Sequence, residues 1–446
     1  MPQANAGETG FGGGFQAGNG GAPADSRLHG RVVDIDTGRP LVGRTVVVAR
    51  DLNDADPEQT TTDARGAFTL PNPGGVYDAL VLEGDGSAVT IYQGLTLQNP
   101  VLTHRWARSL MLTSRLAQVR GNISGGTTFP LSDPGDVVAV HLFTPESTER
   151  YLMGAGGPPF GPEYVTNARF NSSELLPSTV VTLGTFGRKS DMPQSAPAYT
   201  AFAATQTFEL YDGDVVANDI GLEPVELGEI SGAVALPAGR HVTEMREYYR
   251  YPYPGAVLDF PAADYVRKNP VTAGGDFAFE LPVLEDAGAS LCLVGMSDEI
   301  VGMSDEADSL WTERCGLSLG DDAVSIELQA APVLSEPTVD ATVDATTHYA
   351  WSVFEGGIYD LELWPDEPAR GTPGITIMTT ATDLVLPDLS AWNLSLPKSE
   401  TYHVTLFGRG VYVSMDEAFG ARGVGAVIPA EGRVSAAAAV DVTTSP

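Results

Sequence analysis

The chain has 446 residues, too many for one hydrophobic core, which stops growing near ~250–300 residues, so several domains are expected. Its net charge is −33, from 58 acidic and 25 basic residues, and only three of the basic residues are lysine. Generic nucleic-acid binding is excluded, because it needs a positive surface that this composition lacks. No stretch approaches the ~18–20 apolar residues of a membrane span, so no transmembrane segment is expected.

The first 26 residues differ from the rest in composition. Residues 7–26 read GETGFGGGFQAGNGGAPADS, which is typical of a flexible linker, so we expect residues 1–26 to be a glycine-rich tether. This segment resembles the tether that follows the processing site of bacterial surface lipoproteins. It favours an extracellular or outer-surface location, with lipid anchoring through a processed N-terminus as a further expectation.

Beyond the tether, strand-like runs of Val, Ile, Leu, Thr and Phe recur every 8–12 residues between clusters of Gly, Pro, Asn and Asp. No 12-residue stretch has convincing 3.6-residue periodicity. The pattern predicts an all-β chain, with short helical turns only around 261–268 and 414–418.

Three stretches of similar pattern mark a repeat of about 100 residues. LHGRVVD at 28–34, QVRGNIS at 118–124 and EISGAVA at 229–235 each place a glycine between apolar residues, at Gly30, Gly121 and Gly232. A second marker, GAFTLP at 66–71, returns as GDFAFELP at 275–282. Markers in the same order indicate tandem homologous domains, and their glycines are expected where backbones approach closely.

The first repeat carries a further pattern, GRVVD at 30–34, TGRPLVG at 37–43 and TTDARGAFTL at 61–70. Over residues 28–97 it resembles the carboxypeptidase regulatory-like, transthyretin-like domain family. The resemblance implies a non-catalytic β-sandwich attached to other machinery.

The last quarter of the chain has another order of motifs. Trp351 in HYAWSVF is followed by IYDLELW, ITIMTTATDLVLPDL and TYHVTLFG. Over residues 346–411 this order resembles a fibronectin type III-like domain, in which a buried tryptophan and a strand tyrosine fill the core between two sheets.

The fold class predicted from these patterns is all-β, with tandem Ig-like, transthyretin-like and fibronectin III-like β-sandwiches. The expected segments are the tether at 1–26, a transthyretin-like sandwich at 27–116, a sandwich at 117–226, a sandwich with a tyrosine-rich insertion and a disulfide at 227–330, and a fibronectin III-like sandwich at 331–446.

The two cysteines, Cys292 and Cys315, lie within one predicted domain. Both stand in strand-like runs, SLCLVG and ERCGLSL, and neighbouring strands bring Cα atoms within bridging range. We expect a disulfide; the alternative is a pair of buried thiols.

An acidic loop, DLNDADPE at 51–58, offers oxygen ligands of the kind that Ca²⁺ prefers, from Asp51, Asn53, Asp54 and Asp56. It lacks the central glycine and distant glutamate of an EF-hand. We favour a solvated hairpin loop without a cofactor, and keep Ca²⁺ as the alternative.

The run REYYRYPY at 246–253 concentrates the residue types that dominate interface hot spots. The candidate binding residues are Arg246, Tyr248, Tyr249, Arg250, Tyr251 and Tyr253. Flat aromatic faces also suit sugar rings. The alternative is that half of these tyrosines point into the sandwich and the others pack on a neighbouring domain.

The sequence contains no P-loop, G-x-S-x-G, H-E-x-x-H or C-x-x-C motif, and its six histidines show no metal-ligand spacing. We therefore expect no catalytic residues. The predicted function is adhesion, spacing or structural assembly outside the cell, with protein or polysaccharide partners at the cell surface or self-assembly. The alternatives are a carbohydrate-binding accessory protein that uses the tyrosine-rich loop and, least favoured, an enzyme with a convergent site at a domain junction.

Overall fold

The structure is a computed structural model. The residues it describes are 27–35, 40–53, 57–84, 86–104, 115–125, 136–143, 148–154, 162–170, 178–188, 198–204, 208–253, 256–261, 275–284, 289–298, 309–366, 372–392, 394, 396, 398–410, 412–420 and 434–445. Within them the chain is mostly β-strand, with one short helix, α1 (Met415–Phe419), and a 3-10 turn at Ser390–Trp392. The predicted all-β class and the helical turn near 414–418 are confirmed. The turn expected near 261–268 lies, apart from Pro261, outside the described residues. No described helix is long and apolar enough to cross a membrane.

The described strands form six sheets, and they make four two-layer packings along the chain because one long sheet supplies a layer to three of them. We call the segments 27–116, 117–226, 227–330 and 331–446 the first to fourth units. Their bounds as domains remain a prediction. In the first unit, a sheet of three strands packs on a sheet of four. The strands are β4 (Ala67–Pro71), β1 (Arg27–Asp34) and β7 (Val101–His104), against β6 (Ala88–Leu95), β5 (Tyr77–Leu82), β2 (Thr45–Ala49) and β3 (Glu58–Thr61).

The second unit has the same two-layer plan. One layer is β10 (Thr148–Gly154), β9 (Asp136–Phe143), β12 (Ser178–Arg188), β13 (Ala198–Ala204) and β17 (Glu223–Pro224), with β14 (Phe208–Leu210) on β12. The other is β11 (Glu163–Phe170), β8 (Arg115–Ser124) and β15 (Val215–Ala217), with β16 (Ile220–Gly221) on β8.

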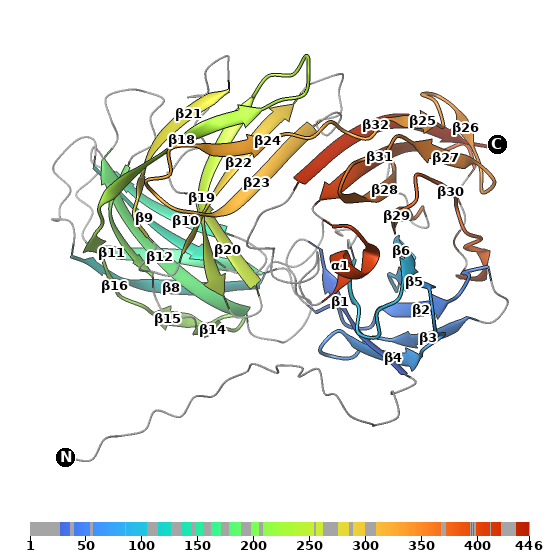
Figure 1. The fold of residues 1–446 in the computed structure, drawn as a ribbon. Coiled ribbons are helices and arrows are strands. Elements are labelled where there is room, and N and C mark those ends of the chain that lie inside the picture. Colours follow the sequence, from blue (N-terminus) through green and yellow to red (C-terminus); the bar gives the residue numbers. More distant parts are fainter. Residues whose placement is uncertain are drawn as a thin grey trace, which may run out of the picture.

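In the third unit, β21 (Asp276–Pro282), β18 (Leu227–Ala235) and β24 (Val324–Glu327) pack on β20 (Ala256–Pro261), β19 (Glu244–Tyr253), β22 (Ser290–Asp298) and β23 (Ser309–Leu317). Phe202 of β13 joins this core from the second unit. Figure 1 shows the second and third units together on one side of the molecule, and the first and fourth on the other.

The fourth unit packs β25 (Leu334–Glu336), β27 (His348–Trp351) and β30 (Asp383–Val385) on β29 (Gly374–Thr379), β28 (Gly357–Pro365), β31 (Thr401–Gly410) and β32 (Val434–Thr444), with β26 (Thr342–Val343) on β32. Trp351 and Tyr402 are both buried in its core, as the strand pattern predicted. The chain is therefore a tandem of β-sandwiches, which confirms the predicted fold class.

The repeated glycine has the same structural role in the first three units. Each first strand, β1, β8 or β18, lies between an antiparallel strand and a parallel strand that ends the unit. A Cβ at Gly121 or Gly232 would lie 1.9 Å from the carbonyl oxygen of Asn218 or Val324, and at Gly30 it would lie 2.9 Å from that of Pro100. A side chain here would push the parallel strand away, so the repeat marks a backbone contact.

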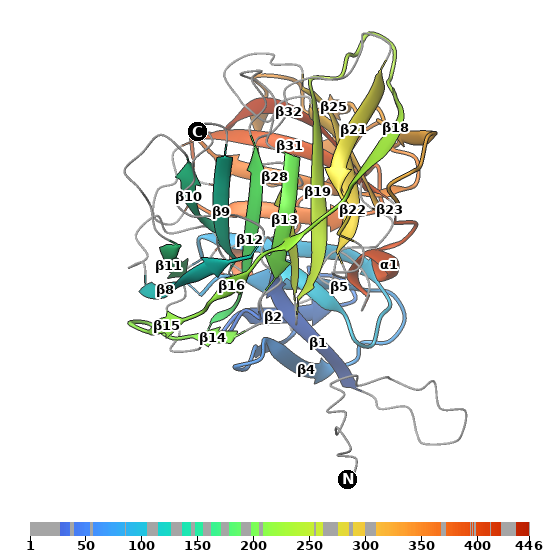
Figure 2. The same ribbon diagram turned by 90° about the vertical axis from the view of Figure 1, so that its left-hand side faces the viewer.

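One long sheet runs through three of the units. Its order is β20-β19-β22-β23-β32-β31-β28-β29-β6-β5-β2-β3, so the fourth unit lies between the third and the first (Figures 1 and 2). β23 pairs antiparallel with β32 from Leu310 to Thr312, and β6 pairs in parallel with β29 from Ala88 to Tyr92. Two units remote in sequence thus share backbone hydrogen bonds.

The pairing of β6 with β29 also matches apolar faces. Ile91 is level with Ile377 in one core cluster, and Tyr92 is level with Met378 in another. The two faces of β2 and β5 divide between the same clusters, which explains why TVVVA and YDALVL are nearly continuous apolar runs rather than alternating ones.

Helix α1 belongs to the fourth unit and covers one end of the core of the first unit. Ser414 caps the helix by accepting from the Glu417 amide at 3.2 Å, and the Glu417 side chain accepts from the amide of Val413, the residue before the cap, at 2.8 Å. Asp416 accepts from the backbone amide of Thr96 at 2.8 Å and from its hydroxyl, 320 positions away in sequence.

The ring of Phe419, at the end of α1, is fully buried edge-on to Tyr92, with centroids 4.8 Å apart. We expect Phe419→Ala to lower the free energy of unfolding by about 3–5 kcal/mol, because a buried ring is replaced by a cavity. Urea denaturation measures the change. Val413→Ala, at an 84% exposed side chain beside the same helix, is the control. Equal stability of the two variants would contradict the closure of the first unit by α1.

Candidate functional site

The tyrosine-rich segment is a strand, not a loop. Residues 246–253 lie on β19, which is hydrogen-bonded to β20 on one side and β22 on the other. This corrects the predicted loop insertion: the alternation of large side chains serves two faces of a sheet. Tyr249 is 1% exposed and donates its hydroxyl to the Pro282 carbonyl. It is a core residue and cannot meet a partner at the surface.

Arg250 is also internal. Its guanidinium pairs with Glu313 at 2.5 Å and donates to the Cys315 sulfur at 3.1 Å and to the Tyr248 hydroxyl at 3.2 Å. The side chains of Arg250 and Glu313 are 6% and 2% exposed, so both charges have left water and each depends on the other. The prediction of a binding role for Arg250 is corrected accordingly. Glu313 was missed, and its only signal was a carboxylate two residues before a strand cysteine.

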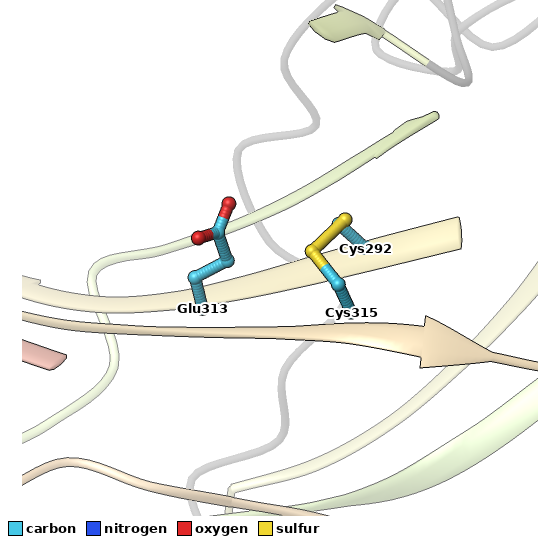
Figure 3. A group of neighbouring side chains, drawn as sticks. All are labelled: Cys292, Glu313 and Cys315. Carbon is cyan, nitrogen blue, oxygen red and sulfur yellow. A yellow bond between two sulfur atoms is a disulfide. The ribbon is translucent and has the colours of Figure 1, made fainter. Parts of the chain in front are cut away.

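The cysteines flank this ion pair. Cys292 and Cys315 face each other on β22 and β23 with Cα atoms 4.0 Å apart, and they form the predicted disulfide (Figure 3). The Glu313 carboxylate lies within 4.8 Å of both sulfurs. This group has metal-ligand composition, but the disulfide uses both thiols and Arg250 neutralises the carboxylate. Its role in this state is structural.

Two of the predicted binding side chains are at or near the surface. Arg246 is exposed and donates to both oxygens of Glu244, at 2.8 and 3.2 Å, and Tyr248 is half-buried. The side chains of Tyr251 and Tyr253 lie outside the described residues. A binding role for these four residues stays a prediction.

The acidic loop is partly described. The Asn53 amide and side chain each donate to one oxygen of Asp51 at 2.9 Å, and the Asn53 side-chain oxygen accepts from the Asp388 amide of the fourth unit at 3.0 Å. Asp54 and Asp56 lie outside the described residues. Two of the four predicted ligands therefore hold the loop and the fourth unit together, and Ca²⁺ binding stays a prediction.

A hollow of about 430 Å³ lies at this contact between the first and fourth units. It is lined by Asp51, Leu52, Asn53, Asp78 and Gln93 of the first unit and by Ala345, Thr346, Val385, Leu386, Pro387 and Asp388 of the fourth. A second hollow of about 340 Å³ shares Ala345 and residues 386–388 with the first and has a more aliphatic lining. The two hollows are therefore neighbours, and we call the pair the junction groove.

The carboxylates of the junction groove differ in environment. Burial raises the pKa of Asp78, the Gly94 amide lowers it, and the charge of Asp51 raises it again. Hydrogen bonds from Thr346 hold the pKa of Asp344 below its usual range, and hydrogen bonds from Ser390 do the same for Asp388. The described lining of the first hollow contains no lysine or arginine, so its field is negative.

Two histidines of the fourth unit each lie between two carboxylates. His348 contacts Glu336 at 3.0 Å and Asp383 at 3.2 Å through its two ring nitrogens, and His403 contacts Asp441 at 2.5 Å and Asp366 at 3.1 Å. The carboxylates lie at opposite ring nitrogens, so neither set can surround one metal ion. The hydrogen bond to Glu336 is the largest cause of the raised pKa of His348, and the hydrogen bond to Asp383 is the next largest. Burial lowers the pKa of His403, but its two carboxylates outweigh this and raise it.

Comparisons with known proteins find only distant similarities among solved structures. No family model matches the chain, and no curated protein matches it. Among solved structures it is similar to the Bacillus anthracis TIE protein, at 10% identity over 68% of this chain and 49% of that one, with a TM-score of 0.15. It therefore spans about half of that protein's length.

Two further structures match over nearly their whole length. One is a tetra-tandem repeat from the extending region of a large adhesion protein, at 9% identity over 94% of this chain and 98% of that one, with a TM-score of 0.17. The other is the streptococcal ancillary pilin, at 11% identity over 68% and 99%, with a TM-score of 0.17. Such low TM-scores carry no argument about function, and the assignment of tandem sandwiches rests on the sheets themselves.

The buried ion pair generates a prediction on stability. Arg250→Met removes the guanidinium that pairs with the buried Glu313 carboxylate, so we expect a loss of about 3–5 kcal/mol in the free energy of unfolding, measured with urea. The double variant Arg250→Met/Glu313→Leu should recover most of this loss. Arg246→Met removes a pair on the same strand whose arginine is 49% exposed, so it should cost about 0–1 kcal/mol. A double variant no more stable than Arg250→Met would contradict the assignment.

The two histidines predict how the stability of the chain depends on pH. Their folded-state pKa values lie above the unfolded value of ~6.5, so their stabilising contribution is complete below that pH and is lost as pH rises through the folded-state values. We expect the fall in melting temperature between pH 6 and 9 to be smaller in His348→Gln/His403→Gln than in the unmodified chain. His241→Gln, at an exposed site of the third unit, is the control. Parallel curves for all three proteins would contradict the prediction.

Proposed function

We propose that this chain is a non-catalytic structural or adhesive protein of the cell exterior, in which four β-sandwiches are locked into a rigid spacer. The observation that carries the proposal is the pairing of β6 with β29, which joins the first unit to the fourth. Contacts between domains of one chain are usually small and polar and permit motion. This joint consists of backbone hydrogen bonds, matched apolar faces and the helix α1.

The joint determines how the chain would carry a load. The described chain begins on β1 in the first unit and ends just after β32 in the fourth. A pulling force between these ends would pass from the first unit to the fourth through the pairing of β6 with β29. The second and third units lie between these two strands in sequence, so they would be outside the path of the force. Such a chain resists extension, which is the property required of a spacer or an assembly subunit.

The groups that could suggest catalysis support the same proposal. Arg250 and Glu313 neutralise each other inside the third unit, and the cysteines are joined to each other. The family resemblance of residues 28–97, which implies a non-catalytic sandwich, and the fibronectin III-like resemblance of residues 346–411 belong to this proposal. So do the extracellular location and the lipid anchor on the tether.

Protein or polysaccharide partners at the cell surface complete the proposal. β3 and β20 end the long sheet among the described strands, and such edges accept a further strand from a partner or a second copy. The carbohydrate-binding alternative is weakened, because Tyr249 and Arg250 are internal and only the other four residues of the tyrosine-rich strand remain for it.

Force spectroscopy tests the rigid spacer directly. The chain is pulled from handles placed before residue 27 and after residue 445. We expect no extension of the second and third units until one event breaks the joint and releases the residues between β6 and β29. Thr96→Ala/Asp416→Ala removes both hydrogen bonds of α1 to the first unit and should lower the force of that event.

Glu229→Gln/Glu280→Gln, at two exposed glutamates paired across β18 and β21, is the matched control and should leave the force unchanged. Stepwise extension of the second and third units before the joint breaks would overturn the proposal.

A further inference from the structure

We propose that the junction groove binds an extended protein segment that carries lysine or arginine side chains next to aliphatic ones. The inference rests on the proposed function, since it names the kind of partner that an assembling surface protein would hold. It assigns a binding site to the contact between the first and fourth units, at a distance from the tyrosine-rich strand.

The groove has the dimensions of a binding site. Its two hollows, of about 430 and 340 Å³, lie in the range of ligand pockets and are adjacent, since Leu386, Pro387 and Asp388 line both. Both units contribute to it, and the Asn53 side chain fixes its rim by accepting from the Asp388 amide. The shape therefore depends on the joint and is present before a partner arrives.

One half of the groove suits a cation. Asp51, Asp78 and Asp388 line the first hollow, and Asp344 lines the second. Asp78 is partly withdrawn from water beside the charge of Asp51, an arrangement that a positive side chain between them would relieve. The basic residue of the described lining, Lys398, is in the second hollow.

The other half suits aliphatic side chains. Val343, Ile375, Leu389, Leu394 and Leu396 line the second hollow. Leu389 and Leu394 are 7% and 5% exposed, so they form the floor of a hollow and do not protrude. An aliphatic side chain that enters the hollow would lose water-exposed area against them, which is favourable.

Two other ligand classes fit the groove less well. A calcium ion needs six to eight oxygens, whereas one oxygen of Asp51 and one of Asp388 already accept hydrogen bonds from Asn53 and Ser390, and the aliphatic half would have no role. A sugar prefers an aromatic platform, and the described lining of both hollows contains no aromatic ring. A segment of alternating lysine and leucine matches both halves.

Fluorescence anisotropy with a labelled Lys-Leu-Lys-Leu peptide tests the proposal. We expect saturable binding to the unmodified chain, and binding at least tenfold weaker for the same peptide with serine in place of leucine. Asp78→Asn/Asp388→Asn should weaken binding of the leucine peptide at least tenfold. Glu229→Gln/Glu280→Gln, which removes the same charge from the third unit, should change it less than twofold.

A second variant makes the test independent of any unfolding caused by the carboxyl changes. Val385 is 46% exposed at the mouth of the first hollow, so Val385→Lys places a cation there at an exposed site. It should block binding, whereas Val333→Lys, at a 64% exposed site outside the lining, should not.

Several outcomes would overturn the proposal: no binding at millimolar peptide, equal affinity for the leucine and serine peptides, or equal losses in the groove variants and their controls. The force measurement reports the joint separately. A chain with an intact joint and no peptide binding would refute the groove alone, and a weak joint would refute the rigid spacer.

Discussion

The parallel pairing of β6 with β29 is the contact on which the remaining architecture depends. Without it, the sheet of the first unit would expose the apolar face that carries Val47 and Leu80, and the edge strand β6 would be open. With it, Ile91 and Ile377 extend one core, while Tyr92, Met378 and Phe419 complete the other. The first and fourth units thus stabilise each other, although the whole of the second and third units separates them in sequence.

The third unit shows how one composition can serve either a surface or an interior. Tyrosine and arginine are typical of interfaces, but they also fill a sandwich when a strand lies between two others. Tyr249 finds the Pro282 carbonyl, and Arg250 finds Glu313, so their polar ends are satisfied inside. The disulfide joins the two strands beside this pair and limits their separation. The strand therefore contributes more to the stability of the unit than its composition suggests.

The junction groove is a consequence of the same joint. Its acidic side chains come from a loop and the strand β5 in the first unit and from loops in the fourth, and they line the same hollows because β6 and β29 align the two sandwiches. An acidic loop that looks like an isolated calcium motif in the sequence thus becomes one wall of a shared hollow. Structural rigidity and recognition would then depend on a single interface.

The sequence by itself determined the all-β class, the tandem repeat with Gly30, Gly121 and Gly232, the disulfide, the short helix and the buried Trp351, because these depend on local periodicity and spacing. Only the tertiary structure decided that three of the sandwiches share one sheet, that Tyr249 and Arg250 are internal, and that Asp51 and Asp388 line one hollow. Period-two alternation defines the two faces of a strand but does not say what covers each face. The apolar runs of β2 and β5 are nearly continuous because both of their faces are covered, but nothing local in the sequence marks β29 as the strand that pairs with β6.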